Sequence, residues 1–527
     1  MNVTAIKENP ARKWWALGAL SLAVVAVSLD STVLSVALPT LAGAFHASES
    51  QLQWFTSGYL LVLAAVMLPA GLLGDTFGRK RLLLVSLALF GVGSAACAFA
   101  ANATEFTVAR LLLGLAGAAI VVMVLAAFTV LFNDEERPRA IGIWAAANFL
   151  ALPLGPILGG WMLTNFWWGW VFLINVPVAA VGVAVAAALV PESRAAVGPG
   201  LDPAGIAFST AGLVSLVYGF IRAGQDGWGD VPALAAMAAG LVLLLVFFLW
   251  ETRLGRRPGG QPLIDVGLFK FRSFTWGVVL SAVAGLAMIG SLFTMPQYFQ
   301  GVLGVNALGS GLRLLPLVGG LLMGTLPAAW VVKAVGAKVA SVAGFAFLGG
   351  GMAVGTLTGT ASSNWFLGFW LALVGIGMGL VMVTASSAAL SQLDADRSGV
   401  GSAVLQAVAK VGAPLGAAIL GSVLHSQYLA GLQAQALTHT VLSPGVLTSA
   451  QQSVFAGVAA ASSVGRGAVQ AVREAFVSGL TSALWVSVAI SLVGLVLAAL
   501  FMPRGATERD KLGKDHGKGA RLVGSDS

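Results

Sequence analysis

The chain has 527 residues, of which 58% are hydrophobic and only 9% are charged, whereas a soluble domain carries about 25% charged residues. This composition excludes a water-soluble surface. Lys and Arg outnumber Asp and Glu by 29 to 21, but they lie between apolar runs instead of clustering on exposed arms, which argues against nucleic-acid binding. The single cysteine, Cys97, lies inside an apolar run, so neither a disulfide framework nor a cysteine metal cluster is expected.

Apolar windows of about 20 residues, the length that crosses a membrane as a helix, recur along the whole chain. The first window follows Lys7, Arg12 and Lys13, as in a signal peptide, but it is too long for the apolar core of such a peptide. We therefore expect it to be retained. Fourteen windows are found, at residues 14–42, 52–74, 81–101, 105–132, 138–163, 168–190, 204–222, 232–250, 274–298, 308–332, 339–359, 364–390, 398–424 and 475–502.

The distribution of basic residues predicts the topology. Most Lys and Arg lie before the first window, between even and odd windows, and after the last window. Because cytoplasmic loops hold the excess of basic residues, both termini are expected in the cytoplasm, and the number of helices is expected to be even. Residues 1–13 then form a cytoplasmic N-terminus, and residues 503–527 form a cytoplasmic tail.

The two halves of the chain resemble each other at one constant spacing. Identical residues recur at corresponding positions, namely Gly78 and Gly336, Arg139 and Arg397, and Pro156 and Pro414. Internal repeats of this kind are typical of transporters. The register predicts an all-α membrane protein with an N-terminal six-helix bundle (14–190), an inserted helix pair (204–250), a cytoplasmic linker (251–273) and a C-terminal six-helix bundle (274–502).

A long external segment, 425–473, is expected between the last two windows. It is rich in Ala, Ser and Gln. An amphipathic hairpin that covers a central cavity and a flexible linker both fit this composition.

The loop after the second window combines glycines, one acid and a basic run, Gly71-Leu-Leu-Gly74-Asp75-Thr-Phe-Gly78-Arg79-Lys80-Arg81. Glycines permit a tight turn, and Asp75 can accept hydrogen bonds from a helix N-terminus or from an Arg. The loop resembles the signature loop of the major facilitator superfamily, which implies a conformational latch made by Gly74, Asp75, Gly78, Arg79 and Lys80. A basic loop that merely follows the positive-inside rule is the alternative. Lys333 replaces Asp75 in the second half, so the latch is expected on one side only.

The first window contains a carboxylate, in the sequence Leu29-Asp30-Ser31-Thr32-Val33-Leu34-Ser35-Val36-Ala37-Leu38-Pro39. Asp30 lies about 24 Å along the helix from Trp14 at 1.5 Å per residue, where an unpaired ionised carboxylate costs several kcal/mol. The motif resembles the first helix of the fourteen-helix drug:proton antiporters, and this resemblance implies that Asp30 carries the proton. A structural carboxyl group bonded to Ser or Thr is the alternative.

Two basic residues lie inside later windows. Arg110, in Ala109-Arg110-Leu-Leu-Leu-Gly114, matches the fourth-helix arginine of these antiporters, which implies proton coupling together with Asp30. Arg110 either pairs with Asp30 or extends to the outer interface near Glu105. Lys410 lies about 18 Å into its helix and either faces a water-filled cavity or is neutral. Related antiporters often carry an Arg-Gln pair at this position.

The fifth window contains Pro153-Leu-Gly155-Pro156-Ile-Leu-Gly159-Gly160. Proline removes a backbone donor and small residues let helices approach closely, so a kinked gating helix is expected. The pattern resembles the Gly-Pro motif of the export branch of the superfamily, which implies efflux. A further signature of that branch is similar to Trp170-Val-Phe172-Leu-Ile-Asn175-Val-Pro177, and the resemblance extends over nearly the whole chain, including Gln300-Gly301 to Leu315-Pro316.

The sequence contains no pattern for catalysis or nucleotide use. A phosphate-binding loop ending in Gly-Lys-Ser or Gly-Lys-Thr is absent. The histidines His46, His425, His439 and His516 fall in predicted loops or in the tail. We therefore expect no enzyme activity, no metal and no cofactor, with the proton gradient as the source of energy.

The predicted function is proton-coupled efflux of lipophilic neutral or monovalent cationic drugs by alternating access. Asp30 is the only acid placed deep in a window, so divalent cations are expected to be poor substrates. The partners expected are lipophilic small molecules, protons and the lipid bilayer, without nucleic acid, for a multi-pass monomer in the inner (cytoplasmic) membrane. The cavity is expected to be lined by Trp54, Tyr59, Trp144, Phe149, Phe293 and Lys410, although each aromatic residue could face lipid instead.

Two alternatives remain. One is dedicated export of a single endogenous metabolite or antibiotic. The other is a transport-dead membrane sensor or assembly partner, which the intact Asp30, Arg110 and Gly155-Pro156 argue against.

Overall fold

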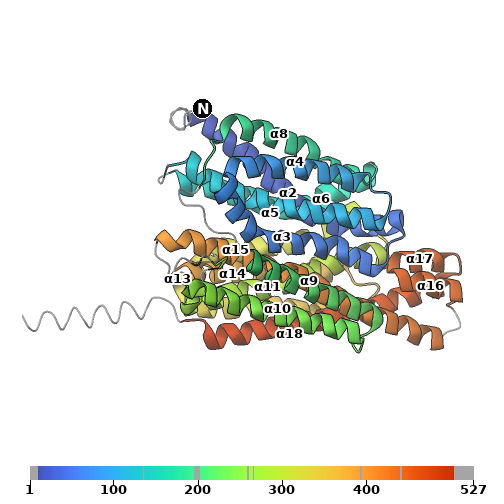
Figure 1. Ribbon diagram of the computed structural model, residues 1–527. Helices are drawn as coiled ribbons and strands as arrows, with labels where there is room; N and C mark the ends of the chain where they lie inside the picture. Colours follow the sequence, from blue (N-terminus) through green and yellow to red (C-terminus); the bar gives the residue numbers. More distant parts are fainter. Residues whose placement is uncertain are drawn as a thin grey trace, which may run out of the picture.

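The computed structural model describes residues 10–133, 136–194, 202–257, 260, 262–264, 266–391, 395–438 and 442–503. Over these residues it is helical and has no strand, which confirms the predicted all-α class (Figure 1). In chain order the elements are α2 (Pro10–Phe45), α3 (Glu49–Phe77), α4 (Arg79–Ala98), α5 (Ala103–Leu131), α6 (Arg137–Asn165), α7 (Trp170–Leu173), α8 (Asn175–Leu189), α9 (Pro203–Asp226), α10 (Val231–Arg256), η1 (Val266–Lys270), α11 (Arg272–Gln297), η2 (Tyr298–Val302), α12 (Ala307–Arg313), α13 (Leu315–Gly355), α14 (Asn364–Leu390), α15 (Ala395–Thr438), α16 (Pro444–Gln452), α17 (Val454–Ser462) and α18 (Arg466–Phe501).

Many of these helices are long and apolar enough to cross a membrane. Within the described residues, 11 single helices qualify, or up to 12 with α3, which bends by 49° near Pro69. The 41-residue helix α13 covers two predicted windows and is interrupted at Gly336, which has a non-helical backbone. The chain is thus a multi-pass membrane protein, and the count of fourteen spans stays a prediction.

Polar residues begin several helices by satisfying free backbone N–H groups. Ser48 and Gln51 form a reciprocal capping box at the start of α3, and the side chains of Asn102, Asp202 and Asp230 accept from the first turns of α5, α9 and α10. Such caps matter at the ends of apolar helices, because an unpaired backbone donor is costly in a membrane.

The helices form two apolar cores. One core is built from α2 to α8, called here the N bundle, and the other from α11 to α18, called the C bundle. In Figure 1 the N bundle lies above the C bundle. A smaller apolar cluster places α9 of the inserted pair against both α3 and α15 through Leu61, Val217 and Ala418.

The internal repeat is visible in the backbone. Gly78 between α3 and α4 has φ 111°, and the corresponding Gly336 within α13 has φ 83°. Both values lie in the region that glycine adopts without steric cost. Each half therefore makes the same glycine-dependent turn after its second helix.

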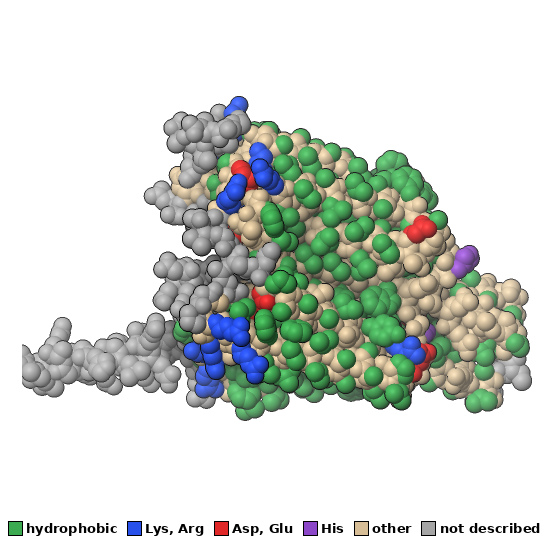
Figure 2. All heavy atoms as spheres, viewed as in Figure 1, with side chains coloured by type: hydrophobic (Ala, Val, Ile, Leu, Met, Phe, Trp, Pro, Cys, Tyr) green, Lys and Arg blue, Asp and Glu red, His purple; other side chains and the backbone are tan. Residues whose placement is uncertain are grey.

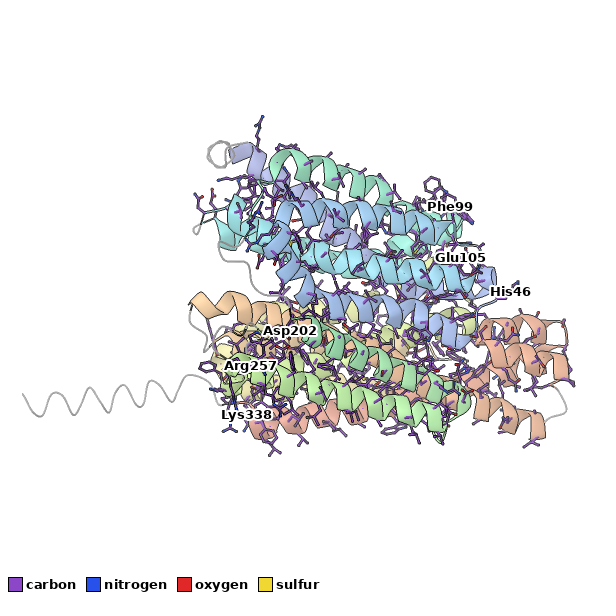
Figure 3. All side chains as sticks on the ribbon, viewed as in Figure 1. His46, Phe99, Glu105, Asp202, Arg257 and Lys338 are labelled. Atoms are coloured by element: carbon purple, nitrogen blue, oxygen red, sulfur yellow. The ribbon has the colours of Figure 1, made fainter. Side chains whose placement is uncertain are left out.

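Charged residues gather at the two ends of the bundles. Lys and Arg side chains crowd one end (Figure 2), where Asp202, Arg257 and Lys338 lie in Figure 3. We call this the basic end. His46, Phe99 and Glu105 lie at the opposite end, called the far end (Figure 3). The segregation agrees with the charge bias in the sequence.

The segment 425–473 is mostly helical where it is described. Helix α15 continues to Thr438, α16 and α17 follow, and α18 already begins at Arg466. Val454 of α17 packs over Gly301 of η2. The described part of this segment is therefore helical and lies at the far end of the bundles (Figure 1), and a hairpin that covers a central cavity stays a prediction.

Candidate functional site

Asp30 and Arg110 form a buried ion pair between α2 and α5. Arg110 Nη1 lies 2.5 Å from Asp30 Oδ2, and the side chains are 0% and 1% exposed. Arg110 Nε also donates to the carbonyl oxygen of Phe55 at 3.2 Å, and its guanidinium lies 4.2 Å from the Tyr59 ring centroid. Asn175 donates to Asp30 Oδ1 at 3.5 Å. Arg110 therefore pairs with Asp30 and does not extend to the interface.

The ion pair lies inside the N bundle instead of on its surface. Tyr59, which the sequence placed on a cavity wall, is fully buried and donates to the carbonyl oxygen of Val27 at 3.1 Å. The polar groups around Asp30 thus come from α2, α3, α5 and α8. Sequence reasoning treated Asn175 only as part of a family signature and missed its contact with Asp30.

Helix α6 packs closely on α2 and on the C bundle through small residues. A Cβ atom on Gly155 would meet the hydroxyl of Thr32, and one on Gly159 would meet Val33. On the other side, Gly160 lies against the backbone of Ala307 in α12. The Gly-Pro motif therefore brings α6 against both α2 and the opposite bundle, and its role as a gating helix stays a prediction. The side chains of Pro153 and Phe149 lie outside the described residues.

The predicted latch loop makes contacts within the N bundle. Asp75 accepts a hydrogen bond from Arg79 Nε at 2.8 Å. Of the two partners expected for Asp75, a helix N-terminus or an arginine, the structure therefore shows the arginine. Lys80 reaches the carbonyl oxygen of Ala187 at 2.7 Å. Glu192, which sequence reasoning missed, accepts from the Lys80 backbone N–H at 3.1 Å and lies 3.7 Å from Arg81. The loop is thus tied to the end of α8.

An apolar pocket lies between the two bundles. It is lined by Thr32, Pro156, Met288, Leu314, Leu317, Val318, Leu321 and Gly375. Thr32 and Pro156 come from the helices that carry Asp30 and the Gly-Pro motif. None of the five expected cavity residues whose side chains are described is among these.

The expected cavity residues are found elsewhere. Trp54 lines a separate groove with Thr104 and Thr107, between α3 and α5. Trp144 is half-buried against the N-bundle core, and Phe293 is fully buried near Gly421. Lys410 of α15 has an exposed side chain, and its expected place on the cavity wall stays a prediction.

The bundles touch through hydrogen bonds at the far end. Gln300 Nε2 donates to the carbonyl oxygen of Val36 at 3.0 Å, and Gln297 Nε2 donates to Glu49 Oε1 at 3.2 Å. Within the described residues, these contacts join α2 and α3 to the C bundle at the far end. Sequence reasoning missed Glu49 and Gln297, and it placed His425 in a loop, which is wrong because His425 is buried within α15.

Two bundles of apolar helices, a pocket between them and an ion pair buried in one of them are typical of a membrane transporter. The family model described as Major Facilitator Superfamily matches residues 20–417, and the chain belongs to this superfamily. This confirms the resemblance found in the sequence.

Curated relatives are efflux and resistance proteins by name. The chain is 33% identical over 429 residues to the tetracenomycin C resistance and export protein of Streptomyces glaucescens, covering 79% of this chain and 77% of that protein. It is 32% identical over 504 residues to the multidrug efflux pump LfrA of Mycolicibacterium smegmatis, covering 93% and 95%. It is 30% identical over 497 residues to the methyl viologen resistance protein SmvA of Salmonella typhimurium, covering 93% and 97%.

A solved structure shares the fold. A bacterial homologue of the human lysosomal transporter Spinster, in an inward-facing and unoccupied conformation, matches with a TM-score of 0.63 at 16% identity, covering 95% of this chain and 100% of that one. At this identity the match shows the fold alone.

Proposed function

We propose that this protein expels lipophilic drugs across the inner (cytoplasmic) membrane in exchange for protons, by alternating access. The observation that carries the proposal is the buried Asp30–Arg110 pair, two residues before Thr32 on the pocket wall. Asp30 is the protonation site, and the apolar pocket takes up the drug. The names of the relatives support efflux.

The coupling runs through α2. Protonation of Asp30 removes one charge of the ion pair and weakens the attraction of α2 for α5. Because α2 contacts α6 where Gly155 meets Thr32, a shift of α2 changes the pocket wall. Transport requires that drug and proton bind the two conformations with different affinities.

The substrate class follows from the pocket and its surroundings. Its lining is apolar, which suits lipophilic neutral molecules and monovalent cations. Lys410 has no acidic partner among the described residues, so a proton on its amine adds an uncompensated positive charge. We propose that Lys410 disfavours divalent cations, and Lys410→Gln tests this because it keeps a polar side chain of similar length.

Dedicated export of one compound is the second candidate. It is favoured by the relative named for export of tetracenomycin C, which matches 79% of this chain. Against it stands the multidrug pump that matches 93%.

A susceptibility panel in an efflux-deficient bacterial host separates the two candidates. The host carries this protein or the Asp30→Asn variant, with and without a protonophore. Multidrug export predicts resistance to several unrelated lipophiles that the protonophore and the variant both abolish. Resistance to a single compound supports the dedicated exporter. Resistance that survives both treatments contradicts proton coupling through Asp30.

A further inference from the structure

Five polar side chains are buried together between the bundles at the far end. Glu49 and Gln53 come from α3 of the N bundle, while Gln297 of α11 and His425 and Tyr428 of α15 come from the C bundle. Their exposed fractions are 3%, 1%, 0%, 6% and 2% respectively. His46, three residues before Glu49, marks this end in Figure 3.

The contacts join α3 to both C-bundle helices. Gln297 donates to Glu49 at 3.2 Å, and Ser422 of α15 donates to Gln53 at 3.4 Å. Tyr428 lies close enough to Glu49 to be affected by its charge. His425 is three residues from both Ser422 and Tyr428, so it shares their face of the helix. The cluster exists only while the bundles meet at this end.

Glu49 differs from Asp30 in its partners. Asp30 is paired with an arginine from its own bundle, whereas Glu49 has no ion pair among the described residues. Its hydrogen-bond partner is a neutral amide from the opposite bundle. An ionised carboxylate buried without a cation is costly, and the neutral acid is much less so.

The unpartnered atoms of the cluster favour the neutral acid. Gln297 Oε1 and His425 Nδ1 are buried without a hydrogen-bond partner among the described residues. An ionised carboxylate only accepts hydrogen bonds, whereas a protonated one also donates. A protonated Glu49 can accept from Gln297 Nε2 and donate to Gln297 Oε1, which satisfies both ends of the amide.

We propose that Glu49 is a proton-exchanging residue of the far-end gate: it takes up a proton from the far-side medium as the bundles close on it and returns it there when they separate. The inference rests on the proposed alternating access. Uptake and release occur on the same side, so Glu49 moves no net proton across the membrane. It makes closure of the gate depend on the far-side pH, separately from the exchange at Asp30.

The neighbouring charged groups are engaged elsewhere. Arg110 of α5 is paired with Asp30, and the Glu105 carboxylate accepts hydrogen bonds from the Ala101 backbone N–H and from Asn102 Nδ2 at the start of α5. Arg222 of α9 pairs with Asp226 and Asp230. His46 lies in the turn after α2, and the basic residues of α4 lie at the basic end. His425 and Tyr428 are the titratable groups of α15 within the cluster.

Distances between spin labels test the gate without requiring transport. The labels are attached at Phe99→Cys in the N bundle and Trp365→Cys in the C bundle, which are 69% and 90% exposed, in a Cys97→Ala background. The protein is reconstituted in lipid nanodiscs and measured from pH 5 to pH 8 with and without an exported drug. Glu49→Gln mimics the protonated acid, Glu49→Asp keeps a titratable group, and Glu105→Gln is the matched control at the same end.

One proton per closure changes the open-to-closed ratio by up to about tenfold per pH unit. With Glu49 and with Glu49→Asp the long distance should become more populated as the pH rises. Glu49→Gln should lose this part of the response and stay closed, while Glu105→Gln should keep it. The inference would be overturned if the population of the long distance changed equally with pH in the protein with Glu49 and in Glu49→Gln. It would also be overturned if Glu105→Gln lost this pH dependence. Distances that change with drug but not with pH refute the gate alone, whereas distances that change with neither refute alternating access as well.

Discussion

Removal of Arg110 should destabilise the N bundle strongly. The side chain is fully buried, lies 2.5 Å from Asp30 and stacks at 4.2 Å on Tyr59. Arg110→Ala leaves the Asp30 carboxylate buried and unpaired, a loss of about 3–5 kcal/mol. Arg81→Ala is the control, because the Arg81 side chain is 73% exposed and its Nε lies as far as 3.7 Å from the Glu192 carboxylate. Loss of such a surface pair costs about 1 kcal/mol or less.

A double-mutant cycle separates the ion pair from simple packing. Asp30→Asn alone leaves Arg110 unpaired, so each single variant carries the cost of an orphaned charge, whereas Asp30→Asn with Arg110→Ala carries neither. The double variant should therefore be destabilised by less than the sum of the two single variants, with a coupling of about 0.5–3 kcal/mol. Unfolding in mixed detergent micelles, followed by tryptophan fluorescence, measures all four proteins. Additive losses would show that the two charges do not depend on each other and would refute the reasoning.

Three further predictions concern coupling, packing and pH. Asp30→Asn should abolish drug-driven proton release in inverted vesicles while the protein still inserts and binds drug; retained release contradicts its role. Gly155→Ala should lower efflux, because its added Cβ meets Thr32 and the overpacking costs about 1–3 kcal/mol of stability. Gly350→Ala is the control, since its Cβ meets open space, and it should leave efflux unchanged. Equal effects of the two substitutions would mean that close packing on α2 is irrelevant. The hydrogen bond from Lys13 lowers the pKa of Glu136. The stability from this contact should therefore be fully present above the ordinary pKa of glutamate and lost as the pH falls through the lowered value. The difference in melting temperature between the protein with Glu136 and the Glu136→Gln variant should vanish in strong acid. A difference that stays constant with pH would contradict the role of the Lys13–Glu136 contact.

Depth along a helix could be predicted from the sequence. Counting residues placed Asp30 and Arg110 at similar levels, and the structure brings them into contact. The window at 14–42 corresponds to helix Pro10–Phe45. These predictions succeed because a span has a fixed rise per residue and a charge inside it needs a partner.

The direction in which a side chain points could not be predicted. In a membrane protein both the core and the lipid are apolar, so apolar periodicity does not distinguish the buried face of a helix. Tyr59 was therefore expected in the cavity, although it packs under Arg110. Glu49 begins a helix, where a carboxylate usually meets water, and its burial depends on Gln297, which lies far along the chain and comes from the other bundle.

The position of the inserted pair makes the two seams between the bundles unequal. Helix α9 packs along the seam between α3 and α15, and Gly224 lies against Ser422 there. The apolar pocket instead lies at the opposite seam, between Pro156 of α6 and Leu317 of α13. The seam between α3 and α15 is thus covered by an extra helix, so we expect a lipophilic molecule dissolved in the bilayer to approach the pocket from the side of α6 and α13.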